Sequence, residues 1–287
     1  ASGCNSFGLR MAEARQMADF GPVSLLLSHQ RTLRDALRTT VQYRQLLNES
    51  LALFIEEVGK TVIVREEVVT DHPMAARQAT ELALGALFRL CSSLLGQHWH
   101  PLTVNFAYEA PAEQQIYSRL FGCKLEFGSE FNGFVFSSVD LDTPNPLADP
   151  VMARYAERFI QSLPGVSDHS LLLDVRKAIY LLLPMGRATV EQVAQAQAVN
   201  LRTLQRRLDA EGVTFSQLIN EVRRDLVRRY MENPRYSLGR IAELLGYSVP
   251  SSFTRWFNAQ FGMPPATWRS RHKGVVAQPA RAGLAYG

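Results

Sequence analysis

Two short stretches near the C-terminal end of the chain carry arginine, glutamine and hydroxyl side chains that would share one face of a helix. Arginine can pair through two hydrogen bonds with O6 and N7 of guanine, and glutamine in the same way with N6 and N7 of adenine. Each stretch therefore has the side chains to read base edges in the major groove of DNA. The candidate base-contacting residues are Arg202, Thr203, Gln205, Arg206, Arg207, Pro250, Ser251, Thr254 and Arg255.

The residues around the first stretch predict two helices joined by a tight turn. Thr189 can cap the first helix and Asn200 the second, because their side-chain oxygens can accept hydrogen bonds from free backbone N–H groups. Ala198 is a small residue at the turn, and Leu204 and Leu208 fall on the inward face of the second helix. This arrangement is typical of a helix-turn-helix unit, whose second helix lies in the major groove.

The same pattern recurs further along the chain. Ser237 can cap a helix, Gly246 suits the tight turn, and Pro250 fits the first turn of the helix that follows. Phe253 and Phe257 take the inward positions that leucines hold in the first unit. An internal repeat of this kind indicates two helix-turn-helix units more strongly than either unit alone.

A basic helix is predicted between the two units, over residues 215–231. At ~1.5 Å per residue this helix would span roughly 25 Å, so it could hold two reading helices near the ~34 Å spacing of one DNA turn. Arg223, Arg224, Arg228 and Arg229 lie off its apolar stripe. We expect phosphate contacts from Arg223, Arg224 and Arg228, which would position the protein on DNA without specifying a sequence.

Charge is segregated along the chain. Residues 1–183 contain 16 Lys and Arg against 20 Asp and Glu, which gives a net charge of −4. Residues 184–273 contain 14 against 7, which gives +7. A basic segment of this kind is expected where a protein meets phosphate, so the acidic remainder must have a different role.

Residues 188–269 closely resemble the DNA-binding domain of AraC/XylS-type regulators. The matching residues are the run IAELLGY at 241–247, then Ser252, Phe253, Arg255, Phe257, Phe261, Gly262, Pro265 and Arg269. The resemblance implies base contacts from the neighbourhoods of Arg202, Gln205 and Arg206 in the first unit, and of the stretch 250–255 in the second. The first unit departs from the family by carrying Leu208 where phenylalanine is usual, which should affect packing rather than base reading.

The first part of the chain mixes helical and strand patterns, which predicts an α+β domain over residues 1–165. Strands are predicted over 51–57, 61–69, 101–108 and, as a further pair, 123–139, with a hairpin at Gly59. Helices are predicted over 23–47 with a break at 28–30, over 74–95 with Asp71 as the cap and Pro73 in the first turn, and over 112–121 up to Gly122. A loop at 141–150 and helices over 151–162 and 167–183 follow.

The fold prediction is therefore an α+β effector-binding and dimerisation domain followed by an all-α DNA-binding domain with two helix-turn-helix units. A connecting helix and linker are expected over 166–187, the DNA-binding domain over 188–273 and a flexible tail over 274–287. Three motifs of the first domain resemble a known domain type: FGPVS at 20–24, TLRDAL at 32–37 and PLTVNF at 101–106. They resemble the companion domain labelled arabinose-binding, which is found in regulators of amino-acid, fatty-acid and virulence genes. The resemblance covers about residues 7–165, and the label does not by itself indicate arabinose.

Effector-binding residues are harder to select. Phe106, Tyr108, Tyr117 and Phe134 could line a cavity, although ordinary core packing is the commoner role of such aromatic residues. Arg119 could meet an anionic effector, although a surface arginine is the commoner case.

Other classes of function have little support. His98 and His100 lack a third ligand nearby, and the three cysteines, Cys4, Cys91 and Cys123, lie far apart. We therefore expect reduced thiols, no metal and no cofactor. No nucleophile–base motif or phosphate-binding loop is present, so an enzyme is not expected. No run approaches eighteen uninterrupted apolar residues and no basic-then-apolar leader opens the sequence, which favours a cytoplasmic protein without membrane contact.

The leading hypothesis is a ligand-responsive transcription regulator that binds promoter DNA as a homodimer. The resemblance favours an activator, with RNA polymerase as a partner. A carboxylate-bearing or fatty metabolite and a nucleotide second messenger both remain open as the small-molecule effector. The main alternative is a ligand-independent regulator whose N-terminal domain serves dimerisation or partner docking, and an enzyme–regulator fusion is a further one.

Overall fold

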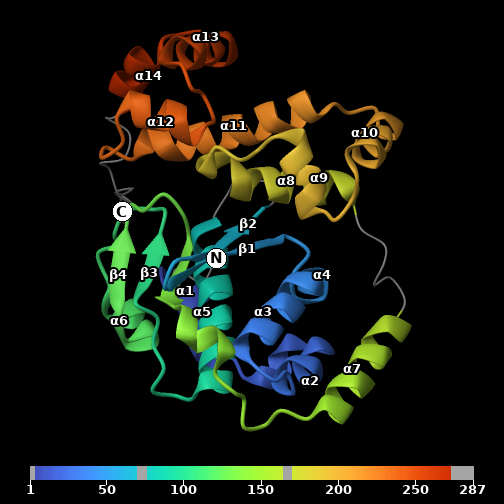
Figure 1. Ribbon diagram of the computed structural model, residues 1–287. Coiled ribbons are helices and arrows are strands. Elements are labelled where there is room, and N and C mark those ends of the chain that lie inside the picture. Colours follow the sequence, from blue (N-terminus) through green and yellow to red (C-terminus); the bar gives the residue numbers. More distant parts are fainter. Residues whose placement is uncertain (1–3, 70–75, 164–169, 273–287) are drawn as a thin grey trace, which may run out of the picture.

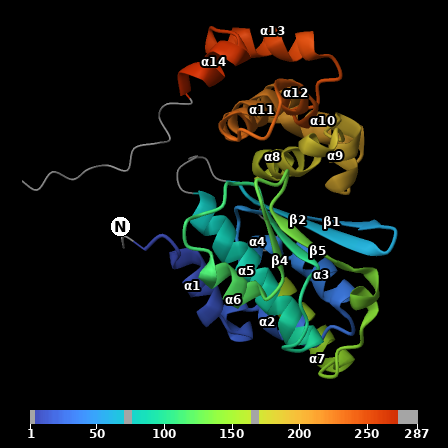
Figure 2. The ribbon, with the colours of Figure 1, turned by 90° about the vertical axis from the view of Figure 1, so that its left-hand side faces the viewer.

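The computed structural model describes residues 4–69, 76–163 and 170–272. An α+β part built around one sheet lies below a part made only of helices, and the two are stacked in contact (Figures 1 and 2). This arrangement confirms the predicted fold class, with the α+β part first in the chain.

The sheet has five strands in the order β1-β2-β5-β3-β4. The strands are β1 Leu51–Val58, β2 Thr61–Val68, β3 Thr103–Phe106, β4 Lys124–Phe127 and β5 Gly133–Ser137. Neighbours are antiparallel except β3 and β4, which run parallel. The segment 123–139 does form two strands, but they are not neighbours, because β3 lies between them. A parallel pair needs a crossover connection, and α6 (Gln115–Phe121) supplies it between β3 and β4.

Helices of the first part pack below and beside the sheet (Figure 2). They are α1 Phe7–Ala14, α2 Val23–Ser28, α3 Leu33–Gln42, α4 Arg44–Leu47 and α5 Ala76–Leu95, together with short 3-10 turns at Met17–Phe20 and Ser138–Asp142. The helical pattern predicted over 23–47 is broken into three, and Thr32 begins α3 by accepting the N–H of Asp35. The predicted cap Asp71 and Pro73 lie outside the described residues.

Two helices lead from the first part to the second. Asp149 caps α7 (Pro150–Ser162) by accepting the N–H groups of Val151 and Met152. The next helix, α8 (Leu171–Leu182), lies in the segment expected to connect the two domains. Its residues Val175 and Ile179 are fully buried in the core of the helical part. The opposite side of α8 rests on the sheet, so this helix is the layer between the two parts (Figure 2).

The remaining helices form the second core. They are α9 Val190–Ala196, α10 Leu201–Ala210, α11 Phe215–Glu232, α12 Leu238–Leu244, α13 Pro250–Phe261 and α14 Pro265–His272, with a 3-10 turn at Leu183–Met185 after α8. The long α11 runs between the pair α9/α10 and the pair α12/α13 (Figure 1). The predicted tail, 274–287, lies outside the described residues.

Candidate nucleic-acid interface and ligand cavity

The first helix-turn-helix unit has the predicted caps. Thr189 Oγ1 accepts the N–H of Gln192 at 3.3 Å, and Asn200 Oδ1 accepts the N–H of Thr203 at 2.8 Å. At the turn between α9 and α10, Ala198 has φ +53°, and no other non-glycine residue in the described ranges has a positive φ. An L-residue rarely adopts this conformation, so the tertiary contacts of the unit hold the turn in place.

The second unit is built in the same way. Ser237 Oγ accepts the N–H of Arg240 at 3.0 Å, and Gly246 takes φ +75° at the turn. A Cβ at Gly246 would lie 3.1 Å from Leu183 Cδ1, so the turn is also closely packed against the rest of the helical core. Pro250 occupies the first turn of α13, and Phe253 anchors this helix from its buried face.

The predicted base-contacting residues lie on the outer faces of α10 and α13. Arg202, Gln205, Arg206, Arg207, Pro250, Ser251, Thr254 and Arg255 are exposed, and Thr203 is half-buried. Arg207 also lines a groove together with Arg44 and Asp174, so its side chain is directed toward the N-terminal part. Two exposed helices with this composition can each enter a major groove.

The arginines of α11 divide into two groups. Arg224 and Arg228 are exposed, as a phosphate contact requires. Arg223 is used within the helical part, because its Nε donates to the Leu245 carbonyl at 2.9 Å and its guanidinium lies 4.3 Å from the Tyr247 ring centre. The phosphate contact expected of Arg223 stays a prediction. In this arrangement of the chain, the Arg223 guanidinium stabilises the turn region of the second unit.

Polar contacts join the end of α11, the loop after it and the second helix-turn-helix unit to the sheet and its loops. Arg229 donates to both carboxylate oxygens of Glu67, at 3.0 and 3.1 Å. Burial alone would lower the pKa of the Arg229 guanidinium, but the Glu67 carboxylate beside it raises that pKa overall. Arg240 Nε donates to Glu130 at 2.8 Å, and Arg235 Nη1 donates to the Phe127 carbonyl at 2.9 Å. These contacts could not be predicted from the sequence, because the residues that make them lie more than a hundred positions apart.

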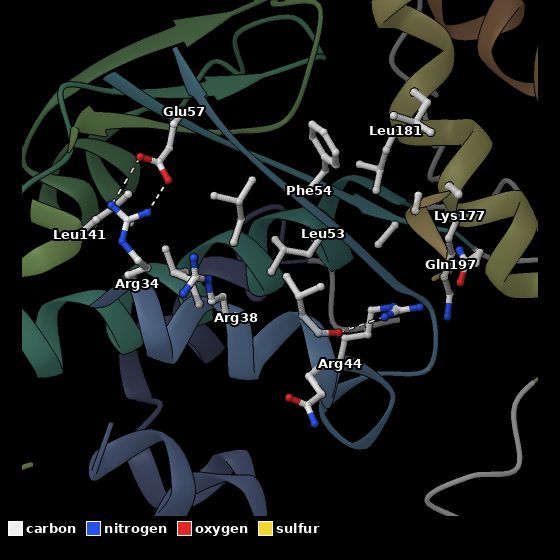
Figure 3. A pocket seen from close by; sticks show the side chains of 18 residues that line it. Arg34, Arg38, Arg44, Leu53, Phe54, Glu57, Leu141, Lys177, Leu181 and Gln197 are labelled. Atoms are coloured by element: carbon white, nitrogen blue, oxygen red, sulfur yellow. Dashed lines mark hydrogen bonds and ion pairs between the residues drawn. The ribbon is translucent and has the colours of Figure 1, made fainter. Parts of the chain in front are cut away.

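A cavity of about 500 Å³ lies between the two parts, and we call it the interdomain cavity. Figure 3 shows Arg34 and Arg38 of α3 on one side of the strand that carries Phe54, with Lys177 and Leu181 of α8 on the other. The strand is β1, which is an edge of the sheet. Apolar side chains from β1, α3 and α8 supply the walls.

The charged side chains that line this cavity are mainly positive. They are Arg34, Arg38, Arg44 and Lys177, against Glu57. Arg34 is paired with Glu57 and, at 2.7 Å, with Asp142. Arg38 is exposed and has no ion pair within the described ranges. Burial lowers the pKa of the Lys177 ammonium, and Asp174, 3.6 Å away, raises it only in part.

The aromatic residues expected to contact an effector lie in the N-terminal part, away from the interdomain cavity. Phe106, Tyr117 and Phe134 are fully buried and pack within the core of the N-terminal part. The hydroxyls of Tyr108 and Tyr117 both donate to the buried Glu81 carboxylate. None of these side chains lines the interdomain cavity, so the expectation that they surround an effector is not supported.

Arg119 also has a structural partner. It makes a two-point ion pair with Glu13, in which its Nε lies 2.7 Å from the carboxylate. Within the described part of the chain, no cluster of three or more His, Cys, Asp or Glu side chains could hold a metal ion. Among the helices described, none has both the length and the apolarity needed to cross a bilayer.

The stacked architecture and the two exposed recognition helices define a DNA-binding protein of the helix-turn-helix class. Comparison with protein families gives the same class, because residues 193–271 match the model of a helix-turn-helix domain. Residues 1–145 match the model described as the arabinose-binding domain of AraC transcription regulators, N-terminal. The chain therefore belongs to the AraC family of transcription regulators.

Several curated relatives align over almost the whole chain. The transcriptional regulator VirS of Mycobacterium tuberculosis is 30% identical over 269 residues, which cover 93% of this chain and 79% of VirS. The ornithine utilization regulator of Pseudomonas aeruginosa is 27% identical over 268 residues, covering 92% and 78%. The crystal structure of the regulator CdpR from Pseudomonas aeruginosa aligns over 92% of this chain and 86% of CdpR, with 22% identity and a TM-score of 0.47. VirS and the ornithine utilization regulator are both named as regulators, in agreement with the prediction that the chain is not an enzyme.

Proposed function

We propose that this regulator responds to a small molecule bound in the interdomain cavity. The observation that carries the proposal is the position of the cavity, because its walls come from both parts of the protein. Leu53 and Phe54 line it from the sheet, and Ala196 and Gln197 line it from the end of α9. A molecule bound there would contact the first helix-turn-helix unit directly before its turn.

A contact of this kind can change DNA binding only under one condition. The ligand must bind more tightly to one arrangement of the two parts than to another. Gln197 already connects them, because its Nε2 donates to the Asp174 carbonyl at 3.0 Å, and the Asp174 carboxylate pairs with Arg44 at 3.2 Å. A ligand beside these groups would strengthen or break this connection, and so shift the position of α10 relative to the sheet.

The lining favours an effector with an anionic group and an apolar body. Arg38 is the open cation of the cavity, since Arg34 and Arg44 already have carboxylate partners. Leu53, Phe54 and Leu181 offer apolar surface for the rest of the molecule. A carboxylate-bearing or fatty metabolite meets both requirements.

On DNA, the chain would read promoter sequence through α10 and α13. We assign base contacts to the exposed residues of both helices and phosphate contacts to Arg224 and Arg228. Activation, with contact to RNA polymerase, rests on the family resemblance.

A homodimer is part of the proposal, and α7 offers a surface for it. Val151, Tyr155 and Phe159 are exposed and spaced four residues apart, so they form an apolar stripe along one face of the helix. The helix lies at the periphery, far from α13 (Figure 1). Pairing through this stripe would leave both recognition helices free to bind repeated half-sites.

The test compares DNA affinity with and without effectors. A preferred DNA site is first selected from random sequences, and its affinity is measured by fluorescence anisotropy against amino acids, fatty acids, sugars and cyclic nucleotides. An effector that acts through the interdomain cavity should need at least a tenfold higher concentration with Arg38→Gln. Arg31→Gln removes an exposed arginine just before α3 and outside the cavity, and it should change nothing. An effector that acts equally on both variants would contradict the assigned site.

The ligand-independent alternative predicts a different result. No compound class would alter DNA affinity, and protein purified from cells would show no bound small molecule by native mass spectrometry. In that case the N-terminal part would serve dimerisation or docking only.

A further inference from the structure

A second cavity lies inside the N-terminal part, between the sheet and α5, and we call it the inner cavity. We infer that the inner cavity binds a short aliphatic ω-amino acid, with the ligand ammonium against Glu66 and its carboxylate toward Arg15. Apart from Leu53, the inner cavity shares no lining residue with the interdomain cavity. The inference is therefore independent of the effector site proposed above.

The space exists because one face of α5 is made of small residues. Ala79, Ala83 and Ala86 line the inner cavity at helical spacing, where larger side chains would fill the gap to the sheet. Leu53 and Leu87 add apolar walls, and the volume is about 120 Å³. A water takes about 30 Å³ in the liquid, and a cavity of ~150 Å³ holds one benzene ring, so the inner cavity has room for about four to six non-hydrogen atoms. A short amino acid such as 3-aminopropanoate has this size.

Glu66 is the polar group that lacks a partner in this cavity. Its side chain is 1% exposed, and its Oε1 has no hydrogen-bond partner in the described structure. Burial raises the pKa of the Glu66 carboxyl, and the neighbouring Glu67 raises it further. Buried polar groups in proteins are almost always satisfied, so an open carboxyl on a cavity wall indicates a missing donor.

The adjacent residue shows which kind of donor would satisfy a carboxylate here. Glu67 points to the opposite face of β2, where the Arg229 guanidinium pairs with it. Arg65, the other charged neighbour on β2, lies over the Phe131 ring at 4.3 Å. Neither the Arg229 nor the Arg65 guanidinium lines the inner cavity, so neither of them supplies a cation to the Glu66 carboxyl there. A ligand ammonium supplies both the positive charge and the N–H donors.

Arg15 is the group that would pair with the carboxylate of the ligand. It lines the inner cavity and has no ion pair among the residues described, and its carbonyl accepts Arg89 Nε at 3.3 Å. Besides Glu66, it is the charged residue of the lining. A molecule with an ammonium at one end and a carboxylate at the other therefore matches both charges, whereas a diamine or a fatty acid matches one of them.

The experiment is calorimetric titration of the full chain with 3-aminopropanoate, propylamine and propanoate. We expect 3-aminopropanoate to bind most tightly, propylamine at least tenfold more weakly and propanoate not at all. Glu66→Gln should weaken 3-aminopropanoate binding at least tenfold, while Glu113→Gln, an exposed change of the same type, should not. Ala83→Leu fills the cavity and should abolish binding, with folding of each variant checked by circular dichroism.

Proton release separates a direct contact from a structural effect. The buried acid must ionise to pair with an ammonium, so binding to the wild type should release protons and tighten as the pH rises. Titrations in two buffers of different ionisation enthalpy measure this release, which should disappear in Glu66→Gln. Equal affinity of the wild type and Glu66→Gln, or no binding of either amine to folded wild type, would overturn the inference. Either result would leave the effector proposal intact, because that proposal rests on Arg38 and the other cavity.

Discussion

Replacing Arg229 by methionine removes the two-point ion pair with Glu67 and keeps most of the apolar stem. The Glu67 side chain is 12% exposed and that of Arg229 is 29% exposed, so the pair is largely shielded from water. Exposed pairs contribute about 0.2–1 kcal/mol, whereas hydrogen bonds to shielded charged groups contribute ~1.5–3 kcal/mol. We therefore expect a coupling energy of roughly 1.5–3 kcal/mol between the two side chains.

A double-mutant cycle with Arg229→Met and Glu67→Gln measures this coupling from urea unfolding curves. Tryptophan fluorescence reports on both parts at once, since Trp99 packs in the N-terminal core and Trp256 and Trp268 pack in the helical core. All four proteins of the cycle should unfold in a single transition, so that each curve gives one free energy of unfolding.

The control is Arg228→Met, which removes the same charge from the neighbouring exposed position of α11. It should change the free energy of unfolding by no more than about 0.5 kcal/mol. A coupling energy below about 0.5 kcal/mol between Arg229 and Glu67 would refute the reasoning, because the pair would then behave as a solvated surface contact.

Four further outcomes are expected. Arg206→Ala should cost roughly 1–3 kcal/mol at a specific DNA site, and unchanged discrimination against scrambled DNA in gel-shift assays would contradict its role. Ala198→Gly should raise the free energy of urea unfolding by about 0.5–1 kcal/mol, since glycine adopts the positive φ at that turn without strain. A lower free energy of unfolding would contradict the view that the backbone of Ala198 is strained. Tyr155→Glu should convert a dimer to a monomer in sedimentation experiments, and an unchanged mass would exclude the α7 stripe as the interface. Burial raises the pKa of the Cys91 thiol to about 12, and hydrogen bonds to Ser6 lower the pKa of the Cys4 thiol. Iodoacetamide at pH 8 should therefore modify Cys4 before Cys91, which peptide mass spectrometry would measure.

The helix-turn-helix units could be predicted from sequence because their determinants are local. Thr189, Asn200 and Ser237 each cap a helix through an N–H three residues away, and Pro250 begins α13 by its own geometry. Ala198 stood out only as a small residue, since nothing in the sequence shows that its φ is positive.

The contacts between the two parts could not be predicted in this way. Arg229 and Glu67 are 162 positions apart, and either residue alone resembles an ordinary surface charge. The same limit applies to the cavities. Aromatic side chains such as Phe106 and Tyr117 have the composition of a ligand pocket, but only the three-dimensional packing shows that other side chains cover them completely. Sequence patterns predict whether a side chain faces inward or outward on its own helix or strand. They do not predict which residues of other elements that side chain contacts.

Glu66 and Glu67 are consecutive residues of β2, and a strand directs consecutive side chains to opposite faces. The Glu66 side chain lines the inner cavity of the N-terminal part, and the Glu67 side chain pairs with Arg229 of the helical part. Both are fixed to the same short piece of backbone, so a displacement of this end of β2 would move both carboxyl groups together. A ligand in the inner cavity, as we propose, would therefore lie one residue along the strand from the ion pair that joins the two parts.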